Sequence, residues 1–290
     1  MTPHPSPARL RSGRALPTAL LILALFAFQL GALQIAVGAR DPEQLWVVAL
    51  FTGVFWIWVA AGLLAWWRRP HNATGLLIVL GGVALFLAGV ANLGIGALAV
   101  VSAIFGTSPL AMTVQLLHAF PSGRLRGRLS IVTVVLGWIA CPVFQLVLLA
   151  IPADAPALFE TAATAQKTLG ITVMVMTAIV LTRRLIAADP AHRRVLAPLF
   201  GYGIVAVLLL AFAGTIVRAL DLEPRIAGVA QLIVSAAIPV AFLLGVLLGG
   251  FRRTGDLEPL SAWLGVSGAG GPAVARALAP HGLAISSGDS

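Results

Sequence analysis

Arginines are the side chains most able to do chemistry in this sequence, and they gather between long apolar segments. A guanidinium group binds phosphate through paired, charge-assisted hydrogen bonds. Basic clusters beside apolar segments are typical of contacts with anionic lipid headgroups. We therefore predict lipid-headgroup anchors at Arg68, Arg69, Arg124, Arg126, Arg128, Arg193 and Arg194.

The residues that catalysis, cofactor binding or metal binding would need are scarce. No Asp or Glu lies in the middle of an apolar segment, which argues against a buried proton carrier. The single cysteine, Cys141, excludes an internal disulfide and a cysteine-based zinc site. Five histidines are scattered along the chain and do not gather on one helix face: His4, His71, His118, His192 and His281. We predict no catalytic, cofactor-binding or metal-binding residues.

His118 is the histidine that the sequence places nearest to the end of an apolar segment. Two interpretations apply to it. An interfacial histidine hydrogen-bonded to its neighbours is the favoured one, and a proton-sensing role is the alternative.

The composition defines the class of protein. Of the 290 residues, 59% are hydrophobic and only 10% are charged, with a mean hydropathy of +1.00. Soluble domains carry about 25% charged residues, so a soluble globular enzyme is excluded. Disorder is excluded as well, because it requires low hydrophobicity.

Apolar segments long enough to cross a bilayer follow one another along the chain. A crossing helix needs about 20 apolar residues, whereas barrel strands would be about ten residues long with alternating polarity. We therefore predict an all-α integral membrane protein with about eight transmembrane helices. Their expected ranges are 16–38, 45–66, 74–93, 97–119, 129–151, 165–187, 195–217 and 226–249.

Two parts of this sequence allow more than one interpretation. Residues 70–123 contain no charged side chain, and two glycines in Asn92–Gly96 are suited to a reversal that divides this stretch into two spans. The first segment follows Arg9, Arg11 and Arg14 as a signal peptide would. Its apolar run is longer than the roughly 7–15 residues of a signal sequence, so we predict an uncleaved helix.

The distribution of charge predicts the orientation. Of the 19 basic residues, 15 lie in the N-terminal segment, in alternate loops and in the C-terminal tail, and the remaining loops hold six of the ten acidic residues. Because cytoplasmic loops are enriched in Lys and Arg, both termini are expected on the cytoplasmic side of the membrane.

Prolines interrupt four of the expected helices at Pro109, Pro142, Pro198 and Pro239. Each removes a backbone hydrogen bond and can kink its helix, which suits a hinge, although membrane helices also tolerate proline without functional reason. We predict that hinge or signal-relay residues, if present, are Pro198, Pro239, Arg252 and Arg253. Polar side chains within the spans are expected to hydrogen-bond between helices: Gln29, Gln34, Asn92, Gln115, Gln145 and Gln231.

Four short motifs carry a resemblance to a known family. They are, in order, WRRPHNATG (67–75), AFPSGRL (119–125), RRVLAP (193–198) and PVAFLLG (239–245). In this order and spacing they resemble the multi-span N-terminal region of actinobacterial sensor histidine kinases, over about residues 16–284. The family implies a leucine-rich juncture after the last span, which Asp256–Leu260 and Trp263–Gly265 resemble, and Ala273–Leu278 resembles the start of the next domain.

The chain departs from this family where a kinase core would follow. His192 precedes an arginine rather than an acidic residue, and no motif of an ATP-binding domain is present. The resemblance therefore implies three parts: a basic cytoplasmic N-terminus (1–15), a membrane domain (16–249) and a short tail (250–290). No enzymatic activity is expected of this chain alone.

We expect a membrane-embedded sensory input and anchoring module of a two-component sensor kinase, catalytically incomplete in this chain. The alternative is a small transporter or permease for a neutral or lipid-like solute; an integral-membrane enzyme ranks third because no catalytic pair is visible. Expected partners are anionic lipids and, by the resemblance, a second copy of the chain and a separate kinase subunit or response-regulator pathway. Nucleic acid is not expected, because no loop is long enough to form a folded basic surface.

Overall fold

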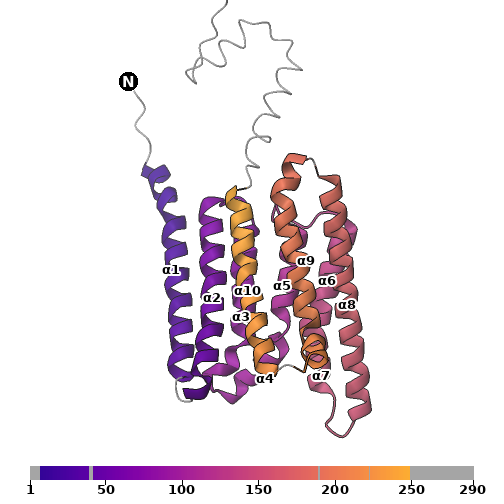
Figure 1. The fold of residues 1–290 in the computed structure, drawn as a ribbon. Helices are drawn as coiled ribbons and strands as arrows, with labels where there is room; N and C mark the ends of the chain where they lie inside the picture. Colours follow the sequence, from indigo (N-terminus) through magenta and orange to yellow (C-terminus); the bar gives the residue numbers. More distant parts are fainter. Residues whose placement is uncertain (1–6, 39–41, 189, 222, 249–290) are drawn as a thin grey trace, which may run out of the picture. The chain divides into compact units, whose positions relative to one another are not determined.

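The computed structural model describes residues 7–38, 42–188, 190–221 and 223–248 (Figure 1). The tail at 250–290, with Arg252, Arg253 and the expected juncture, lies outside these residues. The described elements are α1 (Pro7–Gly38), α2 (Pro42–Arg68), α3 (Thr74–Ala88), the 3₁₀ helix η1 (Val90–Leu93), α4 (Gly96–Phe105), α5 (Ser108–Ala119), α6 (Arg128–Trp138), the π-helix η2 (Ile139–Val143), α7 (Phe144–Ala150), α8 (Pro156–Ala187), α9 (Pro190–Ala219) and α10 (Pro224–Leu248).

The expected all-α membrane fold is confirmed. The described part of the chain contains no strand, and six of its helical segments are long and apolar enough to cross a membrane. They are Ala15–Gly38, Leu45–Arg68, Gly96–Ala119, Arg128–Ala150, Pro156–Ala187 and Gly228–Leu247. Two further apolar helical segments are shorter, Thr74–Ala88 and Ala197–Leu210. Eight crossings, and their direction, remain predictions.

Helix α2 packs against α1, α3 and α10, and its Trp58 is fully buried. The indole lies against α3 at Gly81 and Gly82, where a Cβ atom at Gly81 would overlap the ring. Small residues therefore let two helices approach closely around one large side chain, as is usual where lipid supplies no hydrophobic driving force between helices.

Several expected spans are interrupted or shifted. The reversal expected at Asn92–Gly96 is present, since Gly94 has φ +69° between η1 and α4. The expected span 97–119 is divided into α4 and α5 by a turn at Gly106 and Thr107. Pro109 lies in the first turn of α5, where the missing N–H breaks no helical bond.

Two more boundaries differ from the sequence expectation. Helix α8 begins at Pro156 rather than at 165, because an initial proline is compatible with the first helical turn. The expected span 129–151 consists of α6, the π-helical turn η2 that contains Pro142, and α7. The Gln166 side chain of α8 donates to the carbonyl oxygen of Ala140 in that turn, at 2.8 Å. This bond supplies a partner to a carbonyl in an irregular stretch of helix.

Candidate functional site: the Phe120 junction

The turn after α5 is built by three residues with different backbone roles. Phe120 ends the helix in an extended conformation, and its peptide bond to Pro121 is cis. Gly123 has φ +72°, and its N–H donates to the carbonyl oxygen of Ala119 at 2.9 Å. Proline cannot continue a helix and glycine adopts positive φ without strain, so the sequence itself specifies this sharp turn.

The loop between α2 and α3 is bound to this turn through Asn72. Its Nδ2 donates to the carbonyl oxygen of Pro121 at 2.8 Å. Its Oδ1 accepts from the backbone N–H of Thr74 at 2.9 Å and from the Thr74 hydroxyl at 2.7 Å. Asn72 therefore starts α3 and attaches that start to the α5–α6 turn.

Close contact between the two loops explains the glycine at position 123. A Cβ atom there would lie 2.7 Å from the backbone nitrogens of Ala73 and Thr74. Real Cβ atoms do not come that close to backbone, so any larger residue would separate the loops.

On its other side the turn contacts α9 and α10 through Phe120, which is 3% exposed. Its ring packs edge-on against Phe200 of α9, with centroids 6.4 Å apart, and against Phe242 of α10, at 5.5 Å. A Cβ atom at Gly245 of α10 would lie 3.0 Å from the Phe120 ring. We call this set of contacts, from Asn72 to Phe242, the Phe120 junction.

The junction gathers segments that are distant in sequence. Asn72, Phe120 and Phe242 each belong to one of the motifs of the sequence analysis, and Phe200 follows the third motif by two residues. No local pattern in these segments indicates that the four residues lie together. The structure brings them together at the end of the bundle where α2 ends and α3 begins (Figure 1).

A polar cluster lies next to the junction, at the end of α5. His118 is 1% exposed, and its Nε2 is 3.2 Å from the hydroxyl of Thr177 on α8. The Thr177 hydroxyl donates to the carbonyl oxygen of Val173, so we assign the shared proton to His118 Nε2. Its Nδ1 is buried without a hydrogen-bond partner in the described residues. The expected local hydrogen bonding of His118 is present; proton sensing stays a prediction.

Arg184 completes this cluster and was not singled out by the sequence analysis. One guanidinium nitrogen donates to the carbonyl oxygen of His118 at 2.8 Å, and another to the hydroxyl of Ser130 on α6 at 2.9 Å. Thr177 and Arg184 are seven residues apart, which places them on one helix face. The buried positions of α8 follow the same spacing, so helical phase was the available signal: Val173, Met174, Thr177, Val180 and Leu181.

The predicted hinge residues lie in different surroundings. Pro239 is buried in α10, and because it has no N–H, it cannot bond the carbonyl of Ser235 one turn earlier. The indole N–H of Trp58 donates to that carbonyl oxygen at 3.0 Å. The Tyr202 hydroxyl of α9 donates to the neighbouring carbonyl oxygen of Val234 at 2.7 Å. Pro198, by contrast, is exposed on α9.

The predicted lipid anchors with described side chains are partly engaged by the protein. Arg193 donates to carbonyl oxygens at the end of α8, those of Leu185, Ile186 and Ala188. Arg68 lies over the Trp67 ring, with its guanidinium carbon 5.3 Å from the centroid. The side chain of Arg194 lies outside what the structure describes.

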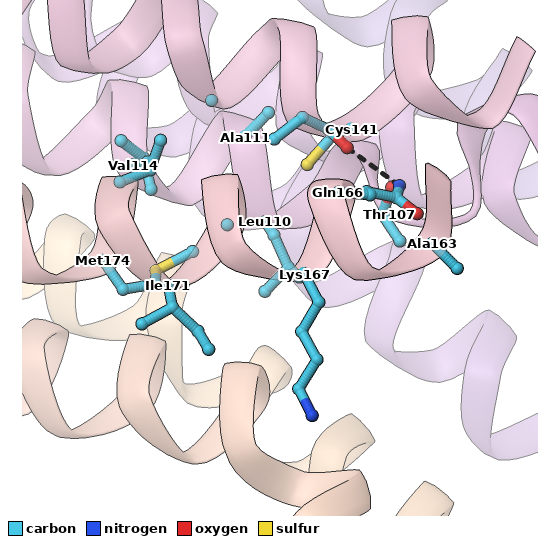
Figure 2. Close-up of a pocket in the computed structure, with 14 residues that line it drawn as sticks. Thr107, Leu110, Ala111, Val114, Cys141, Ala163, Gln166, Lys167, Ile171 and Met174 are labelled. Carbon is cyan, nitrogen blue, oxygen red and sulfur yellow. Dashed lines mark hydrogen bonds between the residues drawn. The ribbon is translucent and has the colours of Figure 1, made fainter. Parts of the chain in front are cut away.

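Two cavities border the opposite end of α5. The smaller, about 200 Å³, lies among α5, α6, η2 and α8 and includes Thr107, Cys141 and Gln166 (Figure 2). Lys167 lines it too, and its side chain extends away from Cys141 and Gln166 in the close-up. The larger, about 670 Å³, lies among α2, α3, α5, α9 and α10. Within the described residues no group of three His, Cys, Asp or Glu side chains could hold a metal ion.

Comparison of the chain with models of protein families, with curated proteins and with solved structures finds no significant match. The geometry is therefore the basis for any functional conclusion. The hydroxyl that faces the His118 ring, that of Thr177, is buried and donates to the carbonyl oxygen of Val173. The geometry also offers a junction through which four separate segments contact one another, and one of them belongs to α10.

Proposed function

We propose that this chain is the membrane-embedded sensory input and anchoring module of a two-component signalling system, with both termini in the cytoplasm of a bacterial cell. A change in helix packing within the membrane would be passed along α10 to the residues after it. Such a change requires a stimulus that favours one of two packings over the other. The alternative from the sequence, a carrier of a neutral or lipid-like solute, is the competing outcome of the test below.

The observation that carries this proposal is the contact of α10 with the α5–α6 turn through Phe120, Phe242 and Gly245. Asn72 attaches the same α5–α6 turn to the start of α3. A shift of α10 at this level must therefore move the turn or break its aromatic contacts. Packed contacts of this kind have a few discrete arrangements rather than a continuous range, which suits a switch.

Pro239 lies within the same helix and is the proposed hinge. The Trp58 side chain of α2 and the Tyr202 side chain of α9 bind carbonyl oxygens about one turn before it, so two neighbouring helices contact the backbone next to the proline. Arg252 and Arg253 would relay the motion beyond the described residues. The arginines at the helix ends would fix the depth of the bundle by binding anionic headgroups.

The experiment joins the full chain, after Ser290, to the dimerisation and ATP-binding core of a histidine kinase and measures autophosphorylation in lipid nanodiscs. Phe120→Ala and Pro239→Ala are expected to change the rate by about fivefold or more, the lower range of allosteric coupling. Gly201→Leu is the matched control, because a Cβ atom at Gly201 meets nothing within 4 Å.

Two results would overturn the proposal. One is a rate that is unchanged in Phe120→Ala and Pro239→Ala, when both variants keep the helical circular dichroism of the parent. The other is solute flux in vesicles that contain the unfused chain, abolished by the same substitutions. The latter result would establish the carrier.

A further inference from the structure

The larger cavity is bounded by the first half of α10 and by four other helices. Its volume of about 670 Å³ is within the usual range of about 300–1,000 Å³ for small-molecule sites. Most of its wall is aromatic and aliphatic, with Trp46 and Phe51 of α2, Leu110 of α5 and Leu232 of α10 among its residues.

The polar groups of this wall carry no formal charge. None of the lining residues is Asp, Glu, Lys, Arg or His, so neither an anion nor a cation would find a counter-charge there. Thr107, Thr113, Gln231 and Ser235 are the lining residues with polar side chains. The hydroxyl of Thr113 donates to the Pro109 carbonyl oxygen and is therefore satisfied.

Thr107 has a polar atom that the protein leaves without a partner. Its Oγ1 is buried and forms no hydrogen bond within the described residues. It lies at the break between α4 and α5, where the side chain does not cap the helix that follows. Because that oxygen has almost no accessible surface, a ligand in the cavity could not reach it, and Thr107 contributes to the wall through its other atoms. Gln231 contributes an amide with both donor and acceptor capacity to the same cavity.

We propose that this cavity binds a neutral amphiphile, a molecule with an apolar body and one hydrogen-bonding end such as a hydroxyl or carbonyl group. The apolar body lies against Trp46, Phe51 and Leu232, and the polar end bonds the amide of Gln231. The uncharged lining selects against fatty acids in their ionised form and against cationic amphiphiles.

The site is placed to act on α10. Gly228, Gln231, Leu232 and Ser235 line the cavity at helical spacing, so they form one face of this helix. Ser235 lies four residues before Pro239, and its carbonyl oxygen is the acceptor of the Trp58 bond. The role of the bound amphiphile as the stimulus rests on the proposed input function. Its binding to the cavity does not depend on that function.

The test uses azioctanol, an octanol carrying a photoreactive diazirine, with the full chain in nanodiscs. After illumination, mass spectrometry locates the labelled residues, and unlabelled octanol is added as competitor. The expected result is labelling of Trp46–Phe51 on α2 and Gly228–Ser235 on α10, and its loss as octanol saturates the site.

A blocking variant and a matched control identify the cavity. A Cβ atom at Gly228 meets nothing within 4 Å, so Gly228→Phe can extend into the space it lines. This variant is expected to lower the competed labelling by about tenfold or more, as for loss of most of the binding energy. Gly201 lines neither cavity, and a Cβ atom there also meets nothing within 4 Å. The control variant Gly201→Phe is therefore expected to retain the competed labelling.

The polar end is tested by removing a hydrogen-bonding group at constant size. Gln231→Leu is expected to raise the octanol concentration for half-maximal competition by about three- to tenfold, as for one hydrogen bond. Thr113→Val, whose hydroxyl already bonds the protein, leaves it unchanged.

Labelling that octanol does not compete, or that Gly228→Phe leaves unaltered, would overturn the site and indicate an acyl chain of the bilayer in its place. Competed labelling together with an unchanged autophosphorylation rate of the kinase fusion would retain the site and overturn its role as stimulus. The failure of the site and the failure of the proposed function are thus separate results.

Discussion

The two ends of α5 differ in how the surrounding chain packs against them. At the C-terminal end, Leu116, Leu117, His118 and Ala119 are all at most 2% exposed, and Phe120 follows in an aromatic cluster. At the N-terminal end, Leu110 borders two cavities, and the Thr107 and Ser108 hydroxyls are buried without partners. One short helix therefore separates a well-packed region from a loosely packed one.

The difference has a cause in the neighbouring elements. The C-terminal end is enclosed by α3, α8, α9 and α10, and neighbouring side chains supply aromatic contacts to Phe120 and hydrogen bonds to the carbonyl oxygens of His118 and Pro121. The N-terminal end follows α4, none of whose residues is buried. Dense packing fixes one arrangement, whereas free volume leaves room for a ligand. Under the two proposals above, α5 connects the larger cavity, where a ligand would bind, to the Phe120 junction, through which the change in packing would pass.

The largest effect is expected from Phe120→Ala. Truncating a buried phenylalanine removes its burial energy and leaves a cavity, at a cost of about 3–5 kcal/mol. Phe51→Ala, at the wall of the larger cavity, should cost about 1–2 kcal/mol, because that ring is only partly buried. The free energy of unfolding in mixed micelles measures both. Equal losses would remove the distinction between the two regions.

The next effect concerns two glycines in the same turn. Gly123→Ala combines positive φ with overlap against the backbone of Ala73 and Thr74, so we expect a loss of about 2–4 kcal/mol. Gly127 has φ +84° but a Cβ atom there meets nothing within 4 Å. Gly127→Ala should therefore cost only about 1–2 kcal/mol. If the two variants unfold at the same denaturant concentration, the close approach of the loops is not the reason for Gly123.

Two threonine substitutions, one at each end of α5, should change the free energy of unfolding in different directions. Thr177→Val removes the partner of the buried His118 ring and is expected to cost about 1–3 kcal/mol. Thr107→Val removes a hydroxyl that has no partner, so stability should be unchanged or higher by up to about 1 kcal/mol. Thermal unfolding in one detergent compares them, and destabilisation by Thr107→Val would show that its hydroxyl is satisfied.

The smallest effect is expected from a pair of asparagines near opposite ends of α3. Asn72→Ala removes the bond to Pro121 and the acceptor for Thr74, at a cost of about 1–2 kcal/mol. Asn92→Ala, in η1, should change stability by less than about 0.5 kcal/mol, because its side chain forms no hydrogen bond within the described residues. Hydrogen exchange at the start of α3 should increase only in the first variant.

Much of the fold follows from the sequence because length and hydropathy govern membrane helices. The helix class, the ending of a helix before Pro121 and the reversal near Gly94 all rest on such local signals. The expectation for polar side chains is confirmed at Gln34, which donates to Gly89, and at Gln115, which accepts from Trp138.

The features that were missed depend on contacts between distant segments. Nothing local distinguishes Gly106 from the other glycines that helices tolerate, so the α4–α5 break could not be expected. Phe120 belongs to a quoted motif, but its partners Phe200 and Phe242 become neighbours only in the folded chain. The charge of Arg184 alone does not distinguish it from the exposed arginines. Its position along α8, however, places it on the same helix face as the buried residues.

The π-helical turn Ile139–Val143 holds an extra residue without changing the face that α7 presents. A π-turn accommodates one residue more than an α-helical path of the same form. Deleting a single residue within this turn would therefore restore regular geometry and leave the residues up to Ala150 facing as they do now. A deletion at the start of α7, by contrast, would rotate the residues after it by about 100°, with a shift of about 1.5 Å along the axis. Leu146 and Leu149, now exposed on the surface of α7, would then turn to new directions without any change in their chemistry.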